Sequence, residues 1–338
     1  MNFSRAFTLL FMLLLILFVL SISVGSVTVP FDEILSIILG KGASKSSWEH
    51  IIVDFRIPRA LTAVVVGSGL AVCGLEMQAL FRNALAGPFV LGISSGASLG
   101  VALAVLAGIS FGLSWMGGWF LVMAGLLGSA LVFFSIIVVS SRVRDNMTLL
   151  IFGLMLGSAT GAIVSVLQFF SKAEDIQIYL LWTFGNLGGV TYDKLAVLIP
   201  IVFAGIFLGF ILSKSLNVML LGEHYATSMG VNVRGSRLGI IISACLLAGA
   251  ITAFCGPIAF IGIAVPHLSR LLINTSNHKV LLPSTALAGA IILLSCDLLA
   301  QLPGSDHVLP LNAVTSLVGA PVVIWVILKK GHIKRSLS

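Results

Sequence analysis

The run Leu195-Ala-Val-Leu-Ile-Pro-Ile-Val-Phe-Ala-Gly-Ile-Phe-Leu-Gly-Phe-Ile-Leu212 contains no charged side chain. About 20 apolar residues in a helix cross the hydrocarbon layer of a membrane, so this run predicts a transmembrane helix. Over the 338 residues of the chain, 58% of the side chains are hydrophobic and 9% are charged, whereas soluble domains carry about 25% charged residues. The composition therefore predicts an all-α integral membrane protein. It excludes a soluble enzyme, a disulfide scaffold, a disordered chain and a nucleic-acid-binding protein.

Similar apolar runs recur along the chain and are separated by glycine, proline and charged residues. The pattern predicts a single transmembrane domain over residues 1–338 with about ten spans. The first run resembles a secretory signal, but nine more runs follow and no clear A-x-A cleavage site ends it, so we expect an uncleaved helix. The predicted spans are 6–28, 58–81, 92–108, 117–139, 148–170, 193–213, 237–254, 256–267, 280–299 and 311–328.

The basic residues are distributed unevenly between the two sides of this predicted bundle. Ten spans place both termini on one side, and with the N-terminus inside, the cytoplasmic segments hold most of the 19 lysines and arginines. Cytoplasmic loops of membrane proteins carry such an excess. We therefore expect a multi-pass protein of the cell membrane with both termini in the cytoplasm, and we attribute the net charge of +7 to this asymmetry.

Glycines recur every four residues in two of the runs, which places each set on one helix face. Neighbouring backbones can approach closely over such faces. We expect tight packing there, and a gliding surface for moving helices is the alternative. The glycines are Gly92, Gly96 and Gly100 in one run and Gly153, Gly157 and Gly161 in the other.

Two stretches far apart in the chain resemble each other. Each opens with a pair of arginines, continues as an apolar run to a Cys-Gly pair, and is followed by a Gly-Pro turn; the stretches are 56–92 and 234–262. The spans that they contain are five apart and so cross in opposite directions. This predicts an inverted internal repeat with halves at roughly 55–190 and 232–330, an arrangement typical of transporters.

The chain contains no recognisable catalytic motif. Gly92-Ile-Ser-Ser-Gly96 matches the nucleophile-elbow pattern, but it lies at the start of a membrane helix and not at a strand-to-helix turn. Phosphate-loop and zinc-protease motifs are missing, and the four cysteines and six histidines are scattered. We therefore expect a non-enzymatic protein without a cofactor or metal of its own. Any uphill transport would draw energy from an ion gradient or from another subunit.

Ionisable groups at membrane depth are costly, so each is a candidate site. Glu76 lies inside the second predicted span, about one turn from Arg82. It reaches the cytoplasmic interface or pairs with Arg82, lines a water-filled path, or takes part in proton coupling. Asp297, near the outer end of the ninth predicted span, is expected as a helix cap or in an interfacial ion pair.

Arg56 and Arg59 are three residues apart at a predicted helix start and therefore share a face. We expect both guanidinium groups to project outward at the external mouth. There they either anchor the helix or dock the carboxylates of an external partner. The polar stretch Leu221–Val231 predicts a short helix that ends at Gly230. With small residues facing outward, it would dock into a groove of another protein.

Together these segments resemble the permease subunit of ABC importers for iron-siderophore, haem or cobalamin, the type II class with ten helices. The resemblance extends from Phe55 to Lys330 and depends on several motifs that occur in the family's order. They are Phe55-Arg-Ile-Pro-Arg59, Met77-Gln-Ala-Leu-Phe-Arg-Asn-Ala-Leu-Ala-Gly-Pro88, Gly222-Glu-His-Tyr-Ala226 with Met229-Gly230, Gly256-Pro-Ile-Ala-Phe-Ile-Gly262, Val265-Pro-His-Leu-Ser-Arg270, Leu281-Leu-Pro283 and Gly319-Ala-Pro-Val-Val-Ile-Trp325.

The resemblance implies partners, a cargo and roles for individual residues. A second permease copy or close paralogue, two ATP-binding subunits that hydrolyse the ATP and an extracytoplasmic substrate-binding protein would complete the importer. Its cargo would be an iron chelate, with cobalamin as the alternative. The implied site residues are Gly222, Glu223, Ala226, Met229 and Gly230 for ATPase coupling, Asn83, Leu85, Asn146 and Met147 for the cytoplasmic gate, and Arg56 and Arg59 for docking of the binding protein.

Some positions depart from the family pattern or have no role in it. Gln301 stands where an arginine is common, Ala84 where proline is usual, Gly87 where an acid is common, and Glu76 at an apolar position. Candidate pathway residues are Glu76 and Gln168, together with Phe169, Phe170, Trp182 and Asn186, which are equally plausible as packing. The alternatives are a proton-driven secondary transporter that uses Glu76, and an intramembrane enzyme or scaffold.

Overall fold

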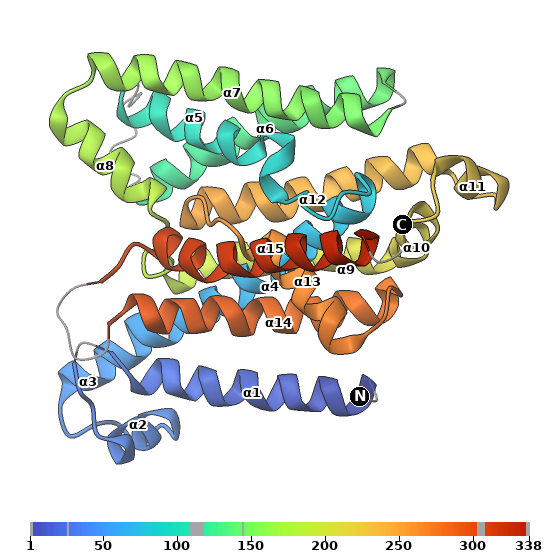
Figure 1. Ribbon diagram of the computed structural model, residues 1–338. Coiled ribbons are helices and arrows are strands. Elements are labelled where there is room, and N and C mark those ends of the chain that lie inside the picture. Colours follow the sequence, from blue (N-terminus) through green and yellow to red (C-terminus); the bar gives the residue numbers. More distant parts are fainter. Residues whose placement is uncertain (1–2, 26, 109–117, 144, 303–307, 336–338) are drawn as a thin grey trace.

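The computed structural model describes residues 3–25, 27–108, 118–143, 145–302 and 308–335, and all regular elements among them are helical. Most of the long helices run alongside one another in a bundle (Figure 1). They are α1 (Phe3–Ser23), α4 (Ile57–Leu80), α6 (Gly118–Arg142), α7 (Asn146–Phe170), α9 (Tyr192–Ile211), α12 (Val233–Cys255), α14 (His278–Ala300) and α15 (Leu311–Arg335). The shorter elements are α2 (Phe31–Ile38), α3 (Ser46–His50), the π-helix η1 (Ile51–Arg56), the 3₁₀ turn η2 (Pro88–Leu91), α5 (Ile93–Val105), α8 (Ala173–Thr183), α10 (Ser213–Met219), α11 (Glu223–Ser228) and α13 (Ile261–Ile273).

Among the described residues, seven helices are long and apolar enough to cross a membrane. They are α1, α6, α7, α9, α12, α14 and the continuous helical stretch that runs from α3 through η1 to the end of α4. Three shorter apolar helical stretches, α5, α13 and the first part of α15, overlap the remaining predicted runs, although α13 begins later than the run 256–267. The prediction of an all-α multi-pass membrane protein is confirmed, whereas the number of ten spans stays a prediction.

The core of the bundle consists of α4, α12 and α14, which are mostly buried, while less than a third of the residues in the apolar windows of α1, α6, α7 and α9 are buried. Small residues allow this packing, because lipid provides no hydrophobic force between helices and close backbone contact must hold them together. A Cβ atom at Gly67 would lie 2.8 Å from the carbonyl carbon of Gly289, and one at Gly74 would collide with the backbone of Gly262.

The predicted glycine faces pack closely in most positions. A Cβ atom at Gly96 would lie 2.6 Å from the carbonyl oxygen of Gly128, so α5 and α6 touch through their backbones. One at Gly153 would lie 2.9 Å from the Cα atom of Leu91, which brings α7 against η2. Gly161 faces open space, so close packing is confirmed for these two contacts but does not extend to that end of α7.

Both halves of the predicted repeat show the same order of elements. In the first half, α4 is followed by a bend and by the 13-residue helix α5. In the second, α12 is followed by a bend and by α13, also with 13 residues. Each short helix also packs on the long helix of the other half, α13 on α4 and α5 on α12. Inversion of one half relative to the other stays a prediction.

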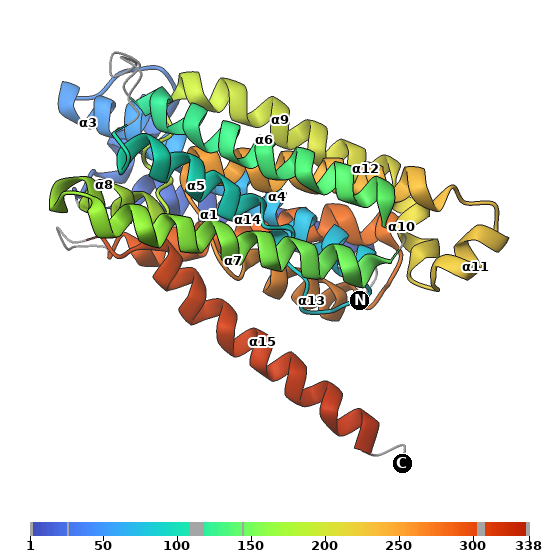
Figure 2. The same cartoon turned by 90° about the horizontal axis from the view of Figure 1, so that it is seen from above.

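The start of α1 and the end of α15 lie towards the same end of the bundle as α11 (Figures 1 and 2). The helices α2, α3 and α8 lie towards the opposite end. These three helices, like α10, were not predicted as separate elements, because they are too short to produce a membrane-spanning run. The arrangement agrees with both termini on one side, and we refer to the α11 end as cytoplasmic by prediction.

Candidate functional site

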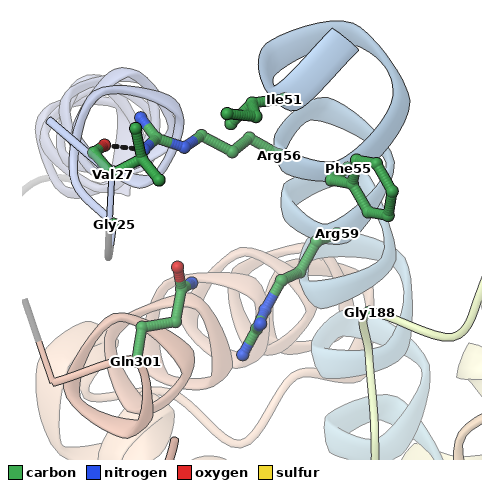
Figure 3. Close-up of a pocket in the computed structure, with 8 residues that line it drawn as sticks. All are labelled: Gly25, Val27, Ile51, Phe55, Arg56, Arg59, Gly188 and Gln301. Carbon is green, nitrogen blue, oxygen red and sulfur yellow. Dashed lines mark hydrogen bonds between the residues drawn. The ribbon is translucent and has the colours of Figure 1, made fainter. Parts of the chain in front are cut away.

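A pocket of about 240 Å³ opens at the end of the bundle opposite α11 (Figure 3). Its walls come from the segment after α1, from η1 and the start of α4, from the loop before α9 and from the residue after α14. The lining residues are Gly25, Val27, Ile51, Phe55, Arg56, Arg59, Gly188 and Gln301. The two arginines of the predicted docking site therefore share one pocket, but their side chains point in different directions (Figure 3).

Arg56 is turned into the protein and is 8% exposed. Its Nη1 donates to the carbonyl oxygens of Ile22 at 2.8 Å and Ser23 at 3.0 Å, and its Nη2 donates to that of Val27. The last carbonyls of a helix lack partners within it and carry the negative end of the helix dipole, so a guanidinium suits the end of α1. The expectation that both arginines project outward is therefore wrong for Arg56.

Arg59 forms a two-pronged ion pair with Asp297 on α14. Its Nε lies 3.0 Å from both carboxylate oxygens, and its Nη2 lies 2.9 Å from Oδ1. Asp297 is fully buried, and the Gln301 amide donates to its Oδ2 at 2.8 Å. The ion-pair prediction for Asp297 is confirmed. The remaining guanidinium nitrogen of Arg59, Nη1, lies beside Gly188 on the pocket wall.

Residues of the predicted cytoplasmic gate meet near the end of α4. Asn146, the first residue of α7, donates its amide to the Leu80 carbonyl at 2.9 Å. Asn83 accepts from the Leu85 backbone at 2.9 Å, which forms the turn after α4. Leu85 and Met147 are 44% and 57% exposed. The structure thus places all four predicted gate residues around one junction between α4 and α7.

His267 on α13 also holds this junction, and sequence reasoning assigned it no role. Its Nε2 lies 2.7 Å from the Ala84 carbonyl, which can only accept, so Nε2 carries the hydrogen. Two further contacts tie α13 to α4: Arg270 donates to Gln78 at 2.6 Å, and Gln78 donates to the Ile263 carbonyl at 3.2 Å. The position of His267 among the apolar residues of the first half of α13 was the available signal.

The predicted coupling segment forms a two-helix projection, α10 and α11, beyond the ends of α9 and α12 (Figure 2). Two glycines in left-handed backbone conformations bound α11: Gly222 with φ 108° and Gly230 with φ 79°. Other residues avoid such values. The short helix predicted over Leu221–Val231 is therefore present, with its end at Gly230.

The exposed face of this projection agrees with the expectation only in part. Ala226 is fully buried, whereas Leu221, Tyr225 and Met229 are 61%, 54% and 57% exposed. Tyr225 belongs to α11, and Leu221 and Met229 lie just before and just after this short helix. Small residues of the segment face outward at Thr227, Ser228 and Gly230, as expected, but not at Ala226, and the larger Leu221, Tyr225 and Met229 are exposed beside them. Glu223 begins α11, and its side chain lies outside the described part of the chain.

Glu76 is completely buried, and the expectations that it reaches the cytoplasmic interface or pairs with Arg82 do not hold. It does not reach the interface, and its described partner is the Ser243 hydroxyl, 2.8 Å from Oε1, rather than Arg82. The carboxyl group fits because α9 has glycine at its closest approach: a Cβ atom at Gly209 would collide with Oε1.

Gln168 lies far from Glu76 along the bundle, near the opposite end of α7, and is half-buried. Beside it, Phe169 and Phe170 are 82% and 80% exposed, with their rings 5.1 Å apart. Trp182 stacks on Tyr179 of the same helix. The two candidate pathway residues, Glu76 and Gln168, therefore lie apart. The apolar rings of Phe169 and Phe170, at the C-terminal end of α7, are exposed.

A model of the FecCD transport family matches residues 13–329. The chain belongs to the FecCD transport family. It is 37% identical over 323 residues to the hemin transport system permease protein HmuU of Yersinia pestis, covering 95% of this chain and 94% of that protein. It is 35% identical over 320 residues to the vitamin B12 import system permease protein BtuC of Klebsiella pneumoniae, covering 94% and 92%.

Among solved structures, a metal-chelate type ABC transporter in an inward-facing conformation superposes with a TM-score of 0.85. The identity is 28%, and the alignment covers 96% of this chain and 99% of that one. The resemblance inferred from the sequence motifs is confirmed, and with it the expectation of a multi-pass membrane permease.

Proposed function

We propose that this FecCD family protein is the permease subunit of an ATP-driven importer for a metal chelate. The observation that carries the proposal is the projection formed by α10 and α11, which presents Leu221, Tyr225 and Met229 beyond the bundle. Two ATP-binding subunits would each receive one such projection. The cargo would be an iron chelate, either haem or an iron-siderophore. Cobalamin is the alternative, since the relatives include permeases named for hemin and for vitamin B12.

The projection is tied to α14 through α10 and leads into α12 through a turn after α11, which suits it to transmit a force. On α10, Asn217 donates to Asn277 at 3.0 Å and accepts from the His278 backbone at 2.8 Å, so it grips the start of α14. On α11, the buried Ala226 accepts from the Val231 backbone at 3.1 Å. A rigid-body displacement of α11 by an ATPase would therefore move α9, α12 and α14.

A second permease copy or a close paralogue would cover the apolar faces that the chain leaves exposed. On α7, Ile151, Leu154 and Met155 are about half exposed or more, and on α15, Leu317 is 75% exposed. The C-terminal part of α15 diverges from the bundle in Figure 2. We infer that the transport path runs between two copies along these faces.

The pocket at the opposite end would receive the substrate-binding protein. Nη1 of Arg59 lies at the pocket wall, where it could meet a carboxylate of that protein, while Arg56 would position the pocket by holding the end of α1. Gln301 stands where a further charge is common in the family, and it donates to Asp297 instead. Charge reversal at Arg59 should weaken association more at low salt than at high salt, since screening removes the attraction.

Energy from ATP fits the structure better than energy from a proton gradient. The proton-driven alternative depends on Glu76, and this side chain is enclosed completely where α4, α9 and α12 meet. A coupling carboxyl must exchange protons with each side of the membrane in turn. The enclosed position of Glu76 favours a structural role, and the work would come from the ATPase subunits.

Reconstitution with the partner ATPase and binding protein in vesicles tests the proposal. We expect uptake of haem, a ferric siderophore or cobalamin that requires ATP and stops when the Walker lysine of the ATPase is changed. Uptake without nucleotide, or uptake abolished only by collapse of the proton gradient, would overturn it.

Two variants test the coupling role in the same vesicles. Gly230→Val forces a left-handed backbone on a β-branched residue, and Glu223→Arg reverses a charge at the start of α11. We expect ATP hydrolysis to continue while uptake is lost. Lys41→Glu, a charge reversal at the opposite end, is the control for insertion and expression. Normal uptake in both α11 variants would remove the coupling assignment.

A further inference from the structure

Glu76 takes part in a hydrogen-bonded contact that joins three helices. The Ser243 hydroxyl on α12 lies 2.8 Å from Glu76 Oε1 on α4 and 2.9 Å from the Gly205 carbonyl on α9. All three groups are within the buried part of the bundle. One turn before Glu76, Cys73 donates to the Ala244 carbonyl at 3.5 Å and adds a second link between α4 and α12.

The number of hydrogens available at this contact bears on the protonation state of the carboxyl group. A serine hydroxyl has one hydrogen, and a backbone carbonyl can only accept. If the Ser243 hydrogen points to Gly205, the contact with Glu76 needs a hydrogen from Glu76 itself. An ionised carboxylate would instead share that single hydrogen with a carbonyl.

The surroundings of Glu76 also disfavour a charge. Within the described residues, Oε2 has no hydrogen-bond partner. The titratable groups nearest to the carboxyl are the buried thiols of Cys73 and Cys245, which offer no positive charge. The facing segment of α9, 195–211, contains no ionisable residue. An ionised carboxyl with one shared donor would be very costly at this depth, whereas a neutral acid needs only one acceptor.

The contact lies between the proposed coupling segment and the predicted gate. Glu76 is one turn from the end of α4, which leads into the gate turn at Asn83, and Gly209 is two residues from the end of α9, which leads into α10 and α11. The third helix, α12, begins directly after α11. Two side chains, Glu76 and Ser243, and the Gly205 carbonyl thus join the two helices that flank the coupling segment to the helix that leads into the predicted gate.

We propose that Glu76 is a protonated carboxylic acid that donates its hydrogen to Ser243, and that this contact makes α4, α9 and α12 move as one unit between α11 and the gate. Glu76 is thus a positioning residue, which rests on the coupling role proposed above. The bound proton is a fixed part of the structure and is not exchanged during transport.

Infrared spectroscopy of the purified wild-type protein and of two variants tests the protonation state. We expect the carbonyl stretch of a neutral carboxylic acid at neutral pH. That band should be missing in Glu76→Gln and shifted in Ser243→Ala. A carboxylate signal from Glu76 at neutral pH would overturn the proposal.

Uptake per ATP hydrolysed tests the positioning role. Glu76→Gln can still donate to Ser243 and should retain the wild-type ratio, whereas Glu76→Met, of similar length, should lower it about threefold or more, the size expected for a lost hydrogen bond between membrane helices. Raising the pH until the acid ionises should lower the ratio in the wild type but not in Glu76→Gln. Equal ratios for the glutamine and methionine variants would refute the positioning role. Wild-type protein without ATP-dependent uptake would instead refute the proposed function.

Gly209 supplies an independent check, because its contact with Glu76 is steric. Gly209→Ala should impair the wild type strongly, since the new methyl group collides with Oε1. In a Glu76→Ala background the same change should be tolerated, because the space is then free. Additive effects of the two changes would contradict direct contact between the two positions.

Discussion

The ion pair between Arg59 and Asp297 joins α4 to α14 through one pair of side chains. Sequence reasoning assigned each residue a type of role, a docking charge and an interfacial ion pair, but could not join them because 238 positions separate them in the chain. The structure brings them together with two parallel contacts of 2.9–3.0 Å. Arg59 thereby joins two helices and also lines the pocket.

Removing only one member of this pair should be costly. Arg59→Ala leaves a fully buried carboxylate with the Gln301 amide as its remaining described donor, and we expect a loss of about 3–5 kcal/mol in the free energy of unfolding. The double change Arg59→Met with Asp297→Leu removes both charges and should cost much less. Thermal unfolding in detergent measures both. Equal losses would show that the charges are not coupled.

Gly74 makes a second prediction at this scale. A methyl group there would press on the backbone of Gly262, which cannot rotate away, so Gly74→Ala should destabilise the α4–α13 contact by about 1–3 kcal/mol or more. Gly161→Ala is the matched control, since Gly161 also lies in a membrane helix but faces open space. The yield of monodisperse protein and its melting temperature would measure the difference. Similar values for the two variants would contradict the close packing.

At the scale of elements, the start of α7 is set by a cap. The Asp145 side chain accepts from the Thr148 backbone and hydroxyl, both at 3.0 Å. Hydrogen bonds from the backbone N–H groups of Thr148 and Met147 hold the pKa of Asp145 below its usual value. The cap lies next to Asn146, whose amide donates to the Leu80 carbonyl, so one local motif positions a residue of the predicted gate.

Asp145→Ala should lower the melting temperature by removing the cap, and Asp145→Asn should preserve most of the cap. Because the pKa of Asp145 is lowered on folding, its contribution is present above the unfolded value of about 3.9 and is lost as the pH falls through the folded value. The stability of the wild type should therefore fall more than that of Asp145→Asn below about pH 4. Parallel pH profiles would rule out this role.

At the scale of the whole molecule, the ends of the bundle differ in chemistry. One end presents α11, the exposed Leu221, Tyr225 and Met229 and the predicted gate. The other end presents the pocket that contains Arg56 and Arg59 and the exposed rings at the end of α7. This polarity matches a permease that meets an ATPase on one side and a binding protein on the other.

Cysteine labelling from one side of the membrane tests the orientation. All four native cysteines are buried, so background labelling should be low. Ser228→Cys, at the exposed last residue of α11, should react with an impermeant reagent only from the cytoplasmic side, and Lys41→Cys only from outside. Reaction of both positions from one side would refute the predicted topology.

Much of the architecture follows from local properties of the chain. Long apolar runs must form helices in lipid, because every backbone polar group needs a partner within its own segment. The long spans, the short α11 with its glycine ends and the close glycine faces could therefore be predicted. So could the family, because its motifs are local and ordered.

Which side chains meet across helices was decided only by tertiary packing. The inward turn of Arg56, the pairing of Arg59 with Asp297, the hold of His267 on the gate turn and the enclosure of Glu76 all depend on where distant helices touch. A span looks equally apolar on its buried and lipid-facing sides, so hydropathy does not show which face is inside. Close approach at Gly74 joins α4 to α13, and the missing side chain at Gly209 leaves room for the enclosed Glu76.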